Sequence, residues 1–353
     1  MMTIILFILI FGVVVLSHEF GHFLIAKLNG IHVVEFSVGM GPTICSFKRK
    51  ETKYALKLLP IGGACMFEGE DGLESESTPE EEKSDEGSFL KANIWARMAT
   101  VVAGPIFNFI LAFIVAIIVV SIQAPARSVV GDVSEGSPAQ AAGLQAGDRI
   151  VSINGEKTPL FKDISLITYL NQGKTMTVVY ERDGQKYETE ITPVYAEDAG
   201  YYLIGIYSTV LTKAEGLEVF RSAFYEMCYS VKNTYKSLGM LVTGKLSRQD
   251  VAGPVGIANV VGKTYETAKN YGVESVVYSM LSIVLLLSVN LGILNLLPIP
   301  ALDGCRLVFL IIELFRGKPV PPEKEGIVHF VGLVFFMVLM VVVLFNDLVN
   351  IFG

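Results

Sequence analysis

Four long stretches without charged side chains constrain the fold of this chain most strongly. They run from Met1 to Ser17, from Met98 to Ala126, from Ser275 to Leu302 and from Ile327 to Asn346. A helix that spans a bilayer needs about 20 mostly apolar residues. We therefore predict four membrane-spanning helices, at residues 2–27, 98–122, 277–297 and 328–350.

The overall composition supports a membrane protein and excludes several other classes. Apolar residues make up 52% of the 353 residues and charged residues only 18%, whereas soluble domains carry about 25% charged residues. A disordered chain would be less apolar and more charged. The net charge of -7 gives no reason to expect nucleic acid as a partner. The four cysteines form no C-x-x-C pair, which argues against a zinc ribbon and a redox dithiol.

Two of the apolar stretches have alternative interpretations. The first could be a cleaved signal peptide, but it has no Lys or Arg before it and no small-residue cleavage site. The third could be a buried helix of a soluble domain, but its length and its Leu, Ile and Val content argue against this. Residues 27–97 hold nine Lys and Arg and residues 303–326 hold four, whereas none precedes the first segment or follows Lys324, so the positive-inside rule places both loops in the cytoplasm. Both termini and residues 123–276 are then expected outside.

Residues 123–207 have the composition of an ordinary β-rich domain. The predicted elements are a strand at Val129–Val133, a short helix at Ser137–Gly143, a strand and Asn-Gly turn at Asp148–Gly155, a helix at Ile164–Asn171, and a hairpin of 175–180 and 187–192 around Asp183-Gly184. This region resembles a PDZ domain. The resemblance is carried by Gly136-Ser-Pro-Ala, Ala-Gly-Leu144, Gly147-Asp-Arg-Ile and Ile-Asn-Gly155. Such domains bind peptide ends by adding a strand to a sheet edge. The alternative is a β-rich spacer without a ligand.

The region 208–276 connects this domain to the third apolar stretch. Phe220, Phe224, Met227 and Val231 recur at helical spacing and predict an amphipathic helix. Such a helix could lie on the membrane surface or pack as an ordinary domain helix. Gly253-Pro-Val-Gly-Ile257 is expected to form a turn before another helix.

A candidate metal site lies in the first apolar stretch, where His18-Glu19-Phe20-Gly21-His22 forms an H-E-x-x-H motif. Two histidines four residues apart lie on one face of a helix and can bind one ion, for which zinc is suited. The glutamate between them can deprotonate a water molecule held by that ion. Ionisable groups within a membrane helix are costly and usually functional. We therefore predict that His18 and His22 are metal ligands and that Glu19 is the catalytic base.

A third protein ligand is expected, because catalytic zinc usually has three. Asp303 ends the third uncharged run, within Asn295-Leu-Leu-Pro-Ile-Pro-Ala-Leu-Asp-Gly304. Pro298 and Pro300 interrupt the helix there, and broken backbone at membrane depth is tolerated where it is buried or lines a cavity. Asp303 and the two histidines then lie at the same cytoplasmic-side depth. The alternative is that Asp303 caps a helix beginning at Gly304.

These motifs, in this order, resemble the site-2 protease family of intramembrane zinc metalloproteases, and within it the bacterial RseP/RasP group. The resemblance implies one zinc ion on His18, His22 and Asp303, with Glu19 as base, and implies that Asn290 and Asn295 engage the substrate backbone. It also implies that residues 33–67 form a β-hairpin-like loop dipping into the membrane, and it includes the Gly104-Pro-Ile-Phe-Asn108 motif. The sequence departs from the usual pattern at Cys305 and at Ala64-Cys65-Met66.

The resemblance further implies substrates and a location. Family substrates are single-span membrane proteins already trimmed on the outside, including anti-sigma factors and remnant signal peptides, and the enzyme is a multi-pass protein of the bacterial inner membrane. A non-catalytic scaffold with structural zinc is a competing hypothesis that the intact Glu19 argues against. A transporter is a third hypothesis, but no inverted repeat is found.

The sequence as a whole predicts a multi-pass α-helical membrane protein, with about four transmembrane helices and an inserted β-rich PDZ domain that lies outside the cell membrane. Its predicted parts are residues 1–122, the PDZ domain at 123–207, the connecting region at 208–276 and the last two helices at 277–353.

Overall fold

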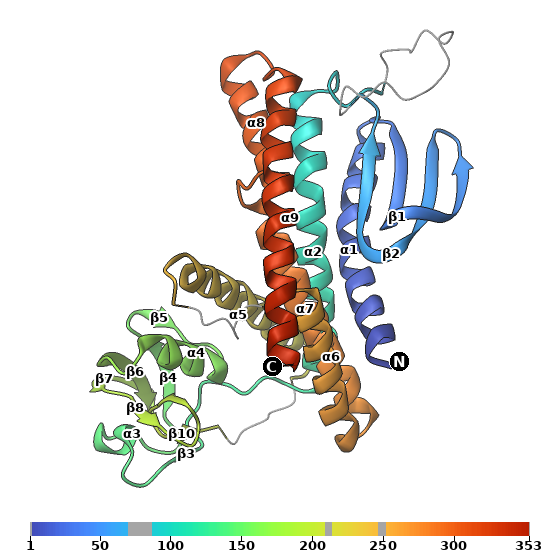
Figure 1. Ribbon diagram of the computed structural model, residues 1–353. Helices are drawn as coiled ribbons and strands as arrows, with labels where there is room; N and C mark the ends of the chain where they lie inside the picture. The colour runs from blue at the N-terminus through green and yellow to red at the C-terminus, as the bar shows by residue number, and fades with distance from the viewer. Residues whose placement is uncertain (1, 70–86, 209–213, 246–251, 353) are drawn as a thin grey trace, which may run out of the picture. The chain divides into compact units, whose positions relative to one another are not determined.

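A computed structural model of the chain describes residues 2–69, 87–208, 214–245 and 252–352. The chain forms two compact units (Figure 1). The first combines residues 1–115 with 234–353, and the second is the continuous stretch 116–233. Residues 209–213 and 246–251 of the predicted connecting region lie outside the described part.

Four helices in the described part are long and apolar enough to cross a membrane, as the sequence predicts. They are α1 (Met2–Leu28), α2 (Ile94–Ile122), α7 (Val273–Leu296) and α9 (Pro322–Phe352). Helices α2 and α9 begin earlier than expected. The prediction counted only the uncharged runs, whereas the helical backbone continues through the charged residues that precede them, such as Arg97 and Lys324.

Small residues let the helices of the first unit approach closely. A Cβ atom on Gly21 of α1 would lie 2.5 Å from the carbonyl oxygen of Ala103 in α2. Glycine at such positions is typical of packed membrane helices, because backbones can then come into contact. Helix α1 also packs against α6 (Pro254–Ala268) and α7. The first apolar segment is therefore an integral part of this unit.

Helix α9 is attached to α6 by a buried carboxylate. Asp347 accepts hydrogen bonds from the backbone N–H groups of Gly253 (3.0 Å) and Gly256 (2.8 Å). These are unpaired donors at the start of α6, and a carboxylate there also interacts favourably with the helix dipole. Helix α6 begins at Pro254, so the predicted turn at 253–257 is already helical.

The segment after α1 folds into a long antiparallel hairpin of β1 (Val33–Arg49) and β2 (Thr52–Phe67). The hairpin bends back on itself, because the start of β1 pairs with two stretches of β2. Glu35, for example, is paired with both Lys53 and Met66. Residues 63–67 pair only with the start of β1 among the described residues, so they form an edge of this sheet, and β2 lies against α1.

The second unit contains the predicted PDZ-like domain, whose sheet has the order β5-β4-β6-β7. One face of the sheet and the helix α4 enclose a core that includes Ile150, Val178 and Ile164. The elements are β3 (Asp132–Val133), α3 (Pro138–Ala141), β4 (Arg149–Ile153), β5 (Glu156–Lys157), α4 (Phe161–Asn171), β6 (Met176–Arg182), β7 (Gln185–Ile191), β8 (Val194–Ala196), β9 (Tyr201–Leu203) and β10 (Ile206–Tyr207).

Most of the expected local structure of this domain is confirmed. The hairpin of β6 and β7 turns at Asp183 and Gly184, which both have positive φ angles (51° and 79°), as a two-residue hairpin turn requires. Ser137 caps α3 through its side chain. The first strand is shorter than predicted, because only Asp132 and Val133 pair with β10, while Val129 forms an isolated bridge with Arg149. A further helix, α5 (Leu217–Val242), follows the domain, and most of it, up to Asn233, belongs to the same unit.

Candidate metal centre

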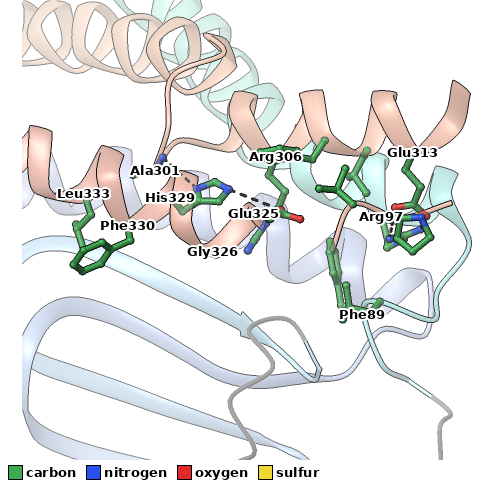
Figure 2. Close-up of a pocket in the computed structure, with 15 residues that line it drawn as sticks. Phe89, Arg97, Ala301, Arg306, Glu313, Glu325, Gly326, His329, Phe330 and Leu333 are labelled. Atoms are coloured by element: carbon green, nitrogen blue, oxygen red, sulfur yellow. Dashed lines mark hydrogen bonds and ion pairs between the residues drawn. The ribbon is translucent and has the colours of Figure 1, made fainter. Parts of the chain in front are cut away.

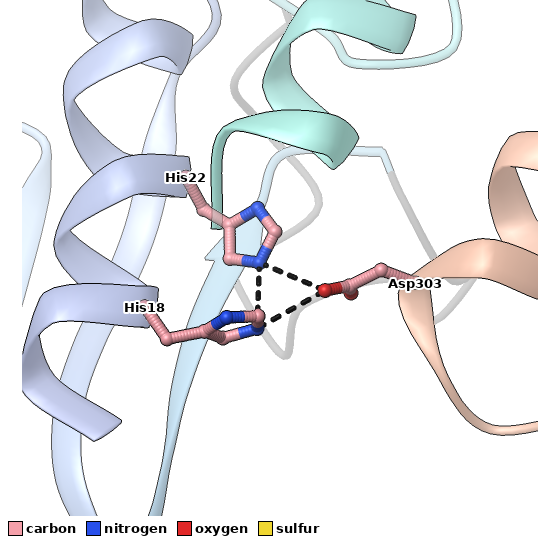
Figure 3. A group of neighbouring side chains, drawn as sticks. All are labelled: His18, His22 and Asp303. Carbon is pink, nitrogen blue, oxygen red and sulfur yellow. Dashed lines mark hydrogen bonds and ion pairs between the residues drawn. The ribbon is translucent and has the colours of Figure 1, made fainter. Parts of the chain in front are cut away.

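The two histidines of the H-E-x-x-H motif lie side by side on α1 (Figure 3). Both side chains are buried, with 7% of each residue exposed. Their Nε2 atoms are 3.2 Å apart, because one helical turn brings residues i and i+4 to the same face. The motif therefore presents two imidazole nitrogens at one point.

Asp303 brings a third donor atom to the same point from α8 (Asp303–Arg316). Its Oδ2 atom lies 3.0 Å from His18 Nε2 and 3.3 Å from His22 Nε2. Zinc–nitrogen bonds of about 2.0–2.1 Å in a tetrahedron require ligand atoms roughly 3.3 Å apart. The three separations fit this geometry, and Oδ2 is buried without a hydrogen-bond partner. These residues form a group that could hold a metal ion.

The alternative role of Asp303, as a helix cap, does not match the geometry. Helix α8 begins at Asp303 itself, and the capping position is occupied by Leu302, which makes no side-chain hydrogen bond. The carboxylate of Asp303 instead faces the two histidines (Figure 3).

The loop between α7 and α8 is folded tightly enough to present Asp303 at this point. A Cβ atom on Gly304 would lie only 2.2 Å from the carbonyl oxygen of Leu297, so the chain can double back only with glycine there. Ala301 has a positive φ angle of 71°, which is unfavourable for a residue with a side chain. The surrounding structure must therefore stabilise this conformation.

Helix α9 provides that support (Figure 2). The backbone N–H of Ala301 donates a hydrogen bond of 3.2 Å to His329 Nδ1. One turn further along α9, a Cβ atom on Gly332 would lie 2.3 Å from Pro300 Cβ, so the helix rests directly on the loop. Beside it lies a cavity of about 460 Å³, lined in part by the ion pair of Arg97 and Glu313. His329, which the motifs left without a role, thus supports the loop that carries Asp303.

Helix α2 contacts the Nδ1 atoms of both histidines, which point away from the three donor atoms. His22 Nδ1 lies 2.8 Å from the carbonyl oxygen of Thr100, so Nδ1 carries the proton and Nε2 is left free to bind a metal. The buried side-chain amide of Asn108 lies 3.2 Å from His18 Nδ1. Asn108 Oδ1 has no other partner, and rotating the amide by half a turn lets this oxygen accept the Nδ1 proton.

Gly104 lies on α2 directly against the two imidazoles. A Cβ atom there would be 2.3 Å from His22 Nε2 and 2.8 Å from His18 Cε1. Sequence reasoning did not assign Thr100, Asn108 or Gly104 to the metal centre. The Gly104-Pro-Ile-Phe-Asn108 motif was the signal that pointed to this turn of α2.

The two predicted substrate-binding asparagines occupy different surroundings on α7. Asn295 Nδ2 lies 3.2 Å from His18 Nε2, so this amide is at the metal centre. Asn290 Oδ1 instead accepts a hydrogen bond from the hydroxyl of Thr234 in α5. The structure therefore brings Asn295, but not Asn290, to the three donor atoms.

Glu19, one residue after His18, is in contact with the edge of the β1–β2 hairpin. The backbone N–H of Cys65 is a hydrogen-bond partner of its carboxylate. A Cβ atom on Gly63 would lie 2.7 Å from Glu19 Cγ. The unusual residue at position 65 leaves this contact unaffected, because the backbone makes it. The predicted base is therefore fixed between the histidines and the sheet edge.

This combination of membrane helices, two buried histidines with an aspartate as donor set and an adjacent glutamate defines a membrane-embedded metallohydrolase. The family comparison is more specific. The chain belongs to Peptidase family M50, the site-2 protease family, whose model matches residues 6–339. It is a zinc metalloprotease, which excludes the hypotheses of a scaffold and a transporter, and its family acts in regulated intramembrane proteolysis.

Similar proteins cover the chain from end to end. The zinc metalloprotease RasP of Bacillus licheniformis is 35% identical over an alignment 431 residues long, covering 100% of both chains. The regulator of sigma-W protease RasP of Bacillus subtilis is 34% identical over 427 residues, covering 99% of each. Among solved structures, the PDZ domain of an SdrC-like protein from Listeria innocua is 26% identical and covers 25% of this chain and 98% of that chain, with a TM-score of 0.22.

Proposed function

We propose that this protein is a zinc endopeptidase that hydrolyses peptide bonds within the transmembrane segments of single-span membrane proteins, such as anti-sigma factors or remnant signal peptides. The observation that carries the proposal is the convergence of His18, His22 and Asp303, with donor atoms 3.0–3.3 Å apart, on helices of the membrane-spanning unit. Cutting a membrane helix requires water and a catalytic site at membrane depth, and these three donor atoms could hold the metal ion of such a site.

One zinc ion would be held by His18 Nε2, His22 Nε2 and Asp303 Oδ2. Bound there, zinc supplies Lewis acidity, polarising the scissile carbonyl and lowering the pKa of a water molecule. Thr100 and Asn108 fix the two imidazole rings from behind, because a ligand histidine whose other nitrogen is hydrogen-bonded keeps its orientation and tautomer.

Glu19 would act as general base and then as general acid. Its carboxylate takes the proton of the attacking water and later delivers it to the leaving amine nitrogen. The backbone N–H of Cys65 holds the carboxylate in place. Asn295, whose amide lies at the donor cluster, can donate a hydrogen bond to the carbonyl oxygen as negative charge develops on it. Asn290 would engage the substrate backbone further from the ion.

The sheet edge at residues 63–67 is the surface on which an unwound substrate would pair. Unwinding a membrane helix leaves its backbone N–H and C=O groups without partners, which is costly in an apolar environment. An exposed strand edge can satisfy these groups by strand addition. This edge carries Gly63 against Glu19, so a paired substrate strand would run past the proposed base.

Removal of the metal is expected to stop cleavage reversibly. The purified full-length protein is placed in lipid vesicles with a single-span substrate already trimmed on one side. A zinc chelator should lower the cleavage rate by at least about a hundredfold, because both carbonyl polarisation and water activation are lost. Stoichiometric zinc should restore the rate. Cleavage that continues in protein shown to contain no zinc would contradict the proposal.

We also propose that the PDZ-like domain binds a peptide end. A groove of about 440 Å³ lies between α4 and residues 201–206, and Thr168 buries an unpaired hydroxyl beside it. A peptide lying along residues 201–206 could add as a strand. The full-length protein should therefore bind peptides with a free carboxyl end more tightly than their amidated forms, by fluorescence polarisation. Equal or absent binding would support a spacer.

The topology that we propose is that of a bacterial inner-membrane protein with its PDZ-like domain outside the cytoplasm. It rests on the Lys and Arg residues of the two loops at 27–97 and 303–326. Membrane-impermeant lysine reagents on intact spheroplasts should then label Lys186 of β7 but not Lys48 of the hairpin. Labelling of Lys48 without labelling of Lys186 would show that the protein has the opposite orientation in the membrane.

A further inference from the structure

A positively charged pocket lies in the second unit, away from the peptide groove. Its volume is about 320 Å³, and it is formed by the chain after α2, by β4, by the β5 region and by α5. Four cationic side chains line it: Arg127, Arg149, Lys157 and Arg221. No established or proposed activity of the protease uses these residues.

Only half of this positive charge is balanced by carboxylates. Arg127 forms an ion pair with Glu218, and Arg149 with Glu181. Lys157 and Arg221 have no ion pair among the residues that the structure describes. Arg221 Nε donates a hydrogen bond of 3.1 Å to the hydroxyl of Tyr225, which raises the pKa of Arg221 further. The pocket therefore keeps a net positive charge and suits an anion.

The chain connectivity places this pocket close to the membrane surface. Residues 116–122, the last part of the membrane-spanning helix α2, belong to the same unit as the pocket. Arg127 follows Ile122 by only five residues, which can span at most about 18 Å. The pocket therefore lies within reach of the layer where lipid headgroups begin.

The helix α5 beside the pocket also exposes an apolar face. Leu217 is 86% exposed, Phe220 51% and Phe224 50%. The opposite face, with Ala223 and Glu226, is buried. One face of α5 thus packs in the domain, and the other remains uncovered. Exposed aromatic and aliphatic side chains beside cationic ones are typical of helices that lie in the membrane interface.

We propose that this pocket binds the phosphate group of an anionic phospholipid while Leu217, Phe220 and Phe224 insert into the same leaflet. A lipid is favoured over a soluble phosphate compound for two reasons: the pocket is tethered to the end of a membrane helix, and the uncovered apolar residues adjoin it. The site would hold the PDZ-like domain against the bilayer surface. The proposal does not depend on the peptidase activity.

The test uses the full-length protein in detergent and measures hydrogen–deuterium exchange in peptides covering residues 149–158 and 217–226. Three probes are compared: dioctanoyl phosphatidylglycerol, dioctanoyl phosphatidylcholine and inorganic phosphate. We expect phosphatidylglycerol to slow exchange in both peptides at concentrations at which phosphatidylcholine has little effect. Each cation near a lipid surface contributes about a fivefold factor in affinity, so R221Q and K157Q should each raise the half-saturating concentration about fivefold.

The matched control is K186Q, which removes the same charge from an exposed position on β7 outside the pocket. Its half-saturating concentration should equal that of the unmodified protein. Equal protection by both lipids would show that only the apolar face binds and would overturn the proposal. Protection by inorganic phosphate without any by phosphatidylglycerol would exclude a lipid as the ligand. An R221Q protein that unfolds at the same temperature as the parent, yet binds phosphatidylglycerol equally well, would also overturn it.

Discussion

Replacing Glu19 with glutamine is expected to abolish proteolysis while the protein still binds zinc. The three donor atoms belong to His18, His22 and Asp303, and none of them is altered by this change. Glutamine has nearly the same shape and can still accept the hydrogen bond from the Cys65 backbone, but it cannot take a proton from water. General base catalysis contributes about 10²–10⁴-fold, so cleavage should fall by about a thousandfold.

The measurement pairs two assays on the same purified sample. Zinc is quantified per chain, and cleavage of a single-span substrate in vesicles is followed by the appearance of its fragments. The matched control is E188Q on the exposed face of β7, which makes the same chemical change far from α1 in sequence and should cleave within about twofold of the parent. Glu19 would lose its assigned role if E19Q cleaved as fast as E188Q. Substrates can be identified by comparing membrane protein fragments from cells that carry the parent protein with those from cells that carry E19Q.

Replacing Gly104 with alanine is expected to damage the metal centre itself, although alanine adds only one methyl group. The new Cβ would lie 2.3 Å from His22 Nε2 and 2.6 Å from its Cε1, which is far inside van der Waals contact. The imidazoles must rotate or α1 and α2 must separate. Disturbing the groups that orient metal ligands typically costs 10–100-fold in affinity, and we expect at least that loss here, with a matching loss of cleavage.

The control for this change is G12A in α1, the helix that carries the two histidines. No atom lies within 4 Å of the Cβ that Gly12 would gain, so alanine fits there and also favours the helix. Zinc affinity, measured by competition with a chromogenic chelator, should fall in G104A and remain unchanged in G12A. If G104A retained the zinc affinity of the parent protein, the close contact of Gly104 with the two imidazoles would not be needed for metal binding.

The sequence predicted the three donor residues that the structure brings together, because their positions depend on short-range rules. Helical periodicity alone brings His18 and His22 to one face. Asp303 was identifiable because it ends an uncharged run three residues after Pro300, the second of two prolines, where a carboxylate has few other reasons to occur. The same local rules predicted the β6–β7 hairpin, since Asp183-Gly184 suits the positive φ angles of its turn.

Other features depended on which segments pack together, and no local pattern specifies that. The partners Thr100 and Asn108 lie about 80–90 residues from the histidines that they hold, and His329 supports the Asp303 loop from a different helix. The contact of Cys65 with Glu19 depends on how the β1–β2 hairpin bends back. Likewise, the shortening of the first strand to Asp132–Val133 follows from the short partner β10.

The sequence by itself therefore determined the membrane-spanning segments, the donor set and the class of chemistry. Each follows from composition over about 20 residues or from the spacing of a few side chains. The tertiary structure alone decided how the donors are oriented and what surrounds them. It placed Gly104 against the imidazoles, Asn295 but not Asn290 at the donor atoms, and an edge of the β1–β2 sheet beside Glu19. The physical reason is that these contacts join segments far apart in the chain, and only close packing of helix against helix and helix against strand brings them within hydrogen-bond distance.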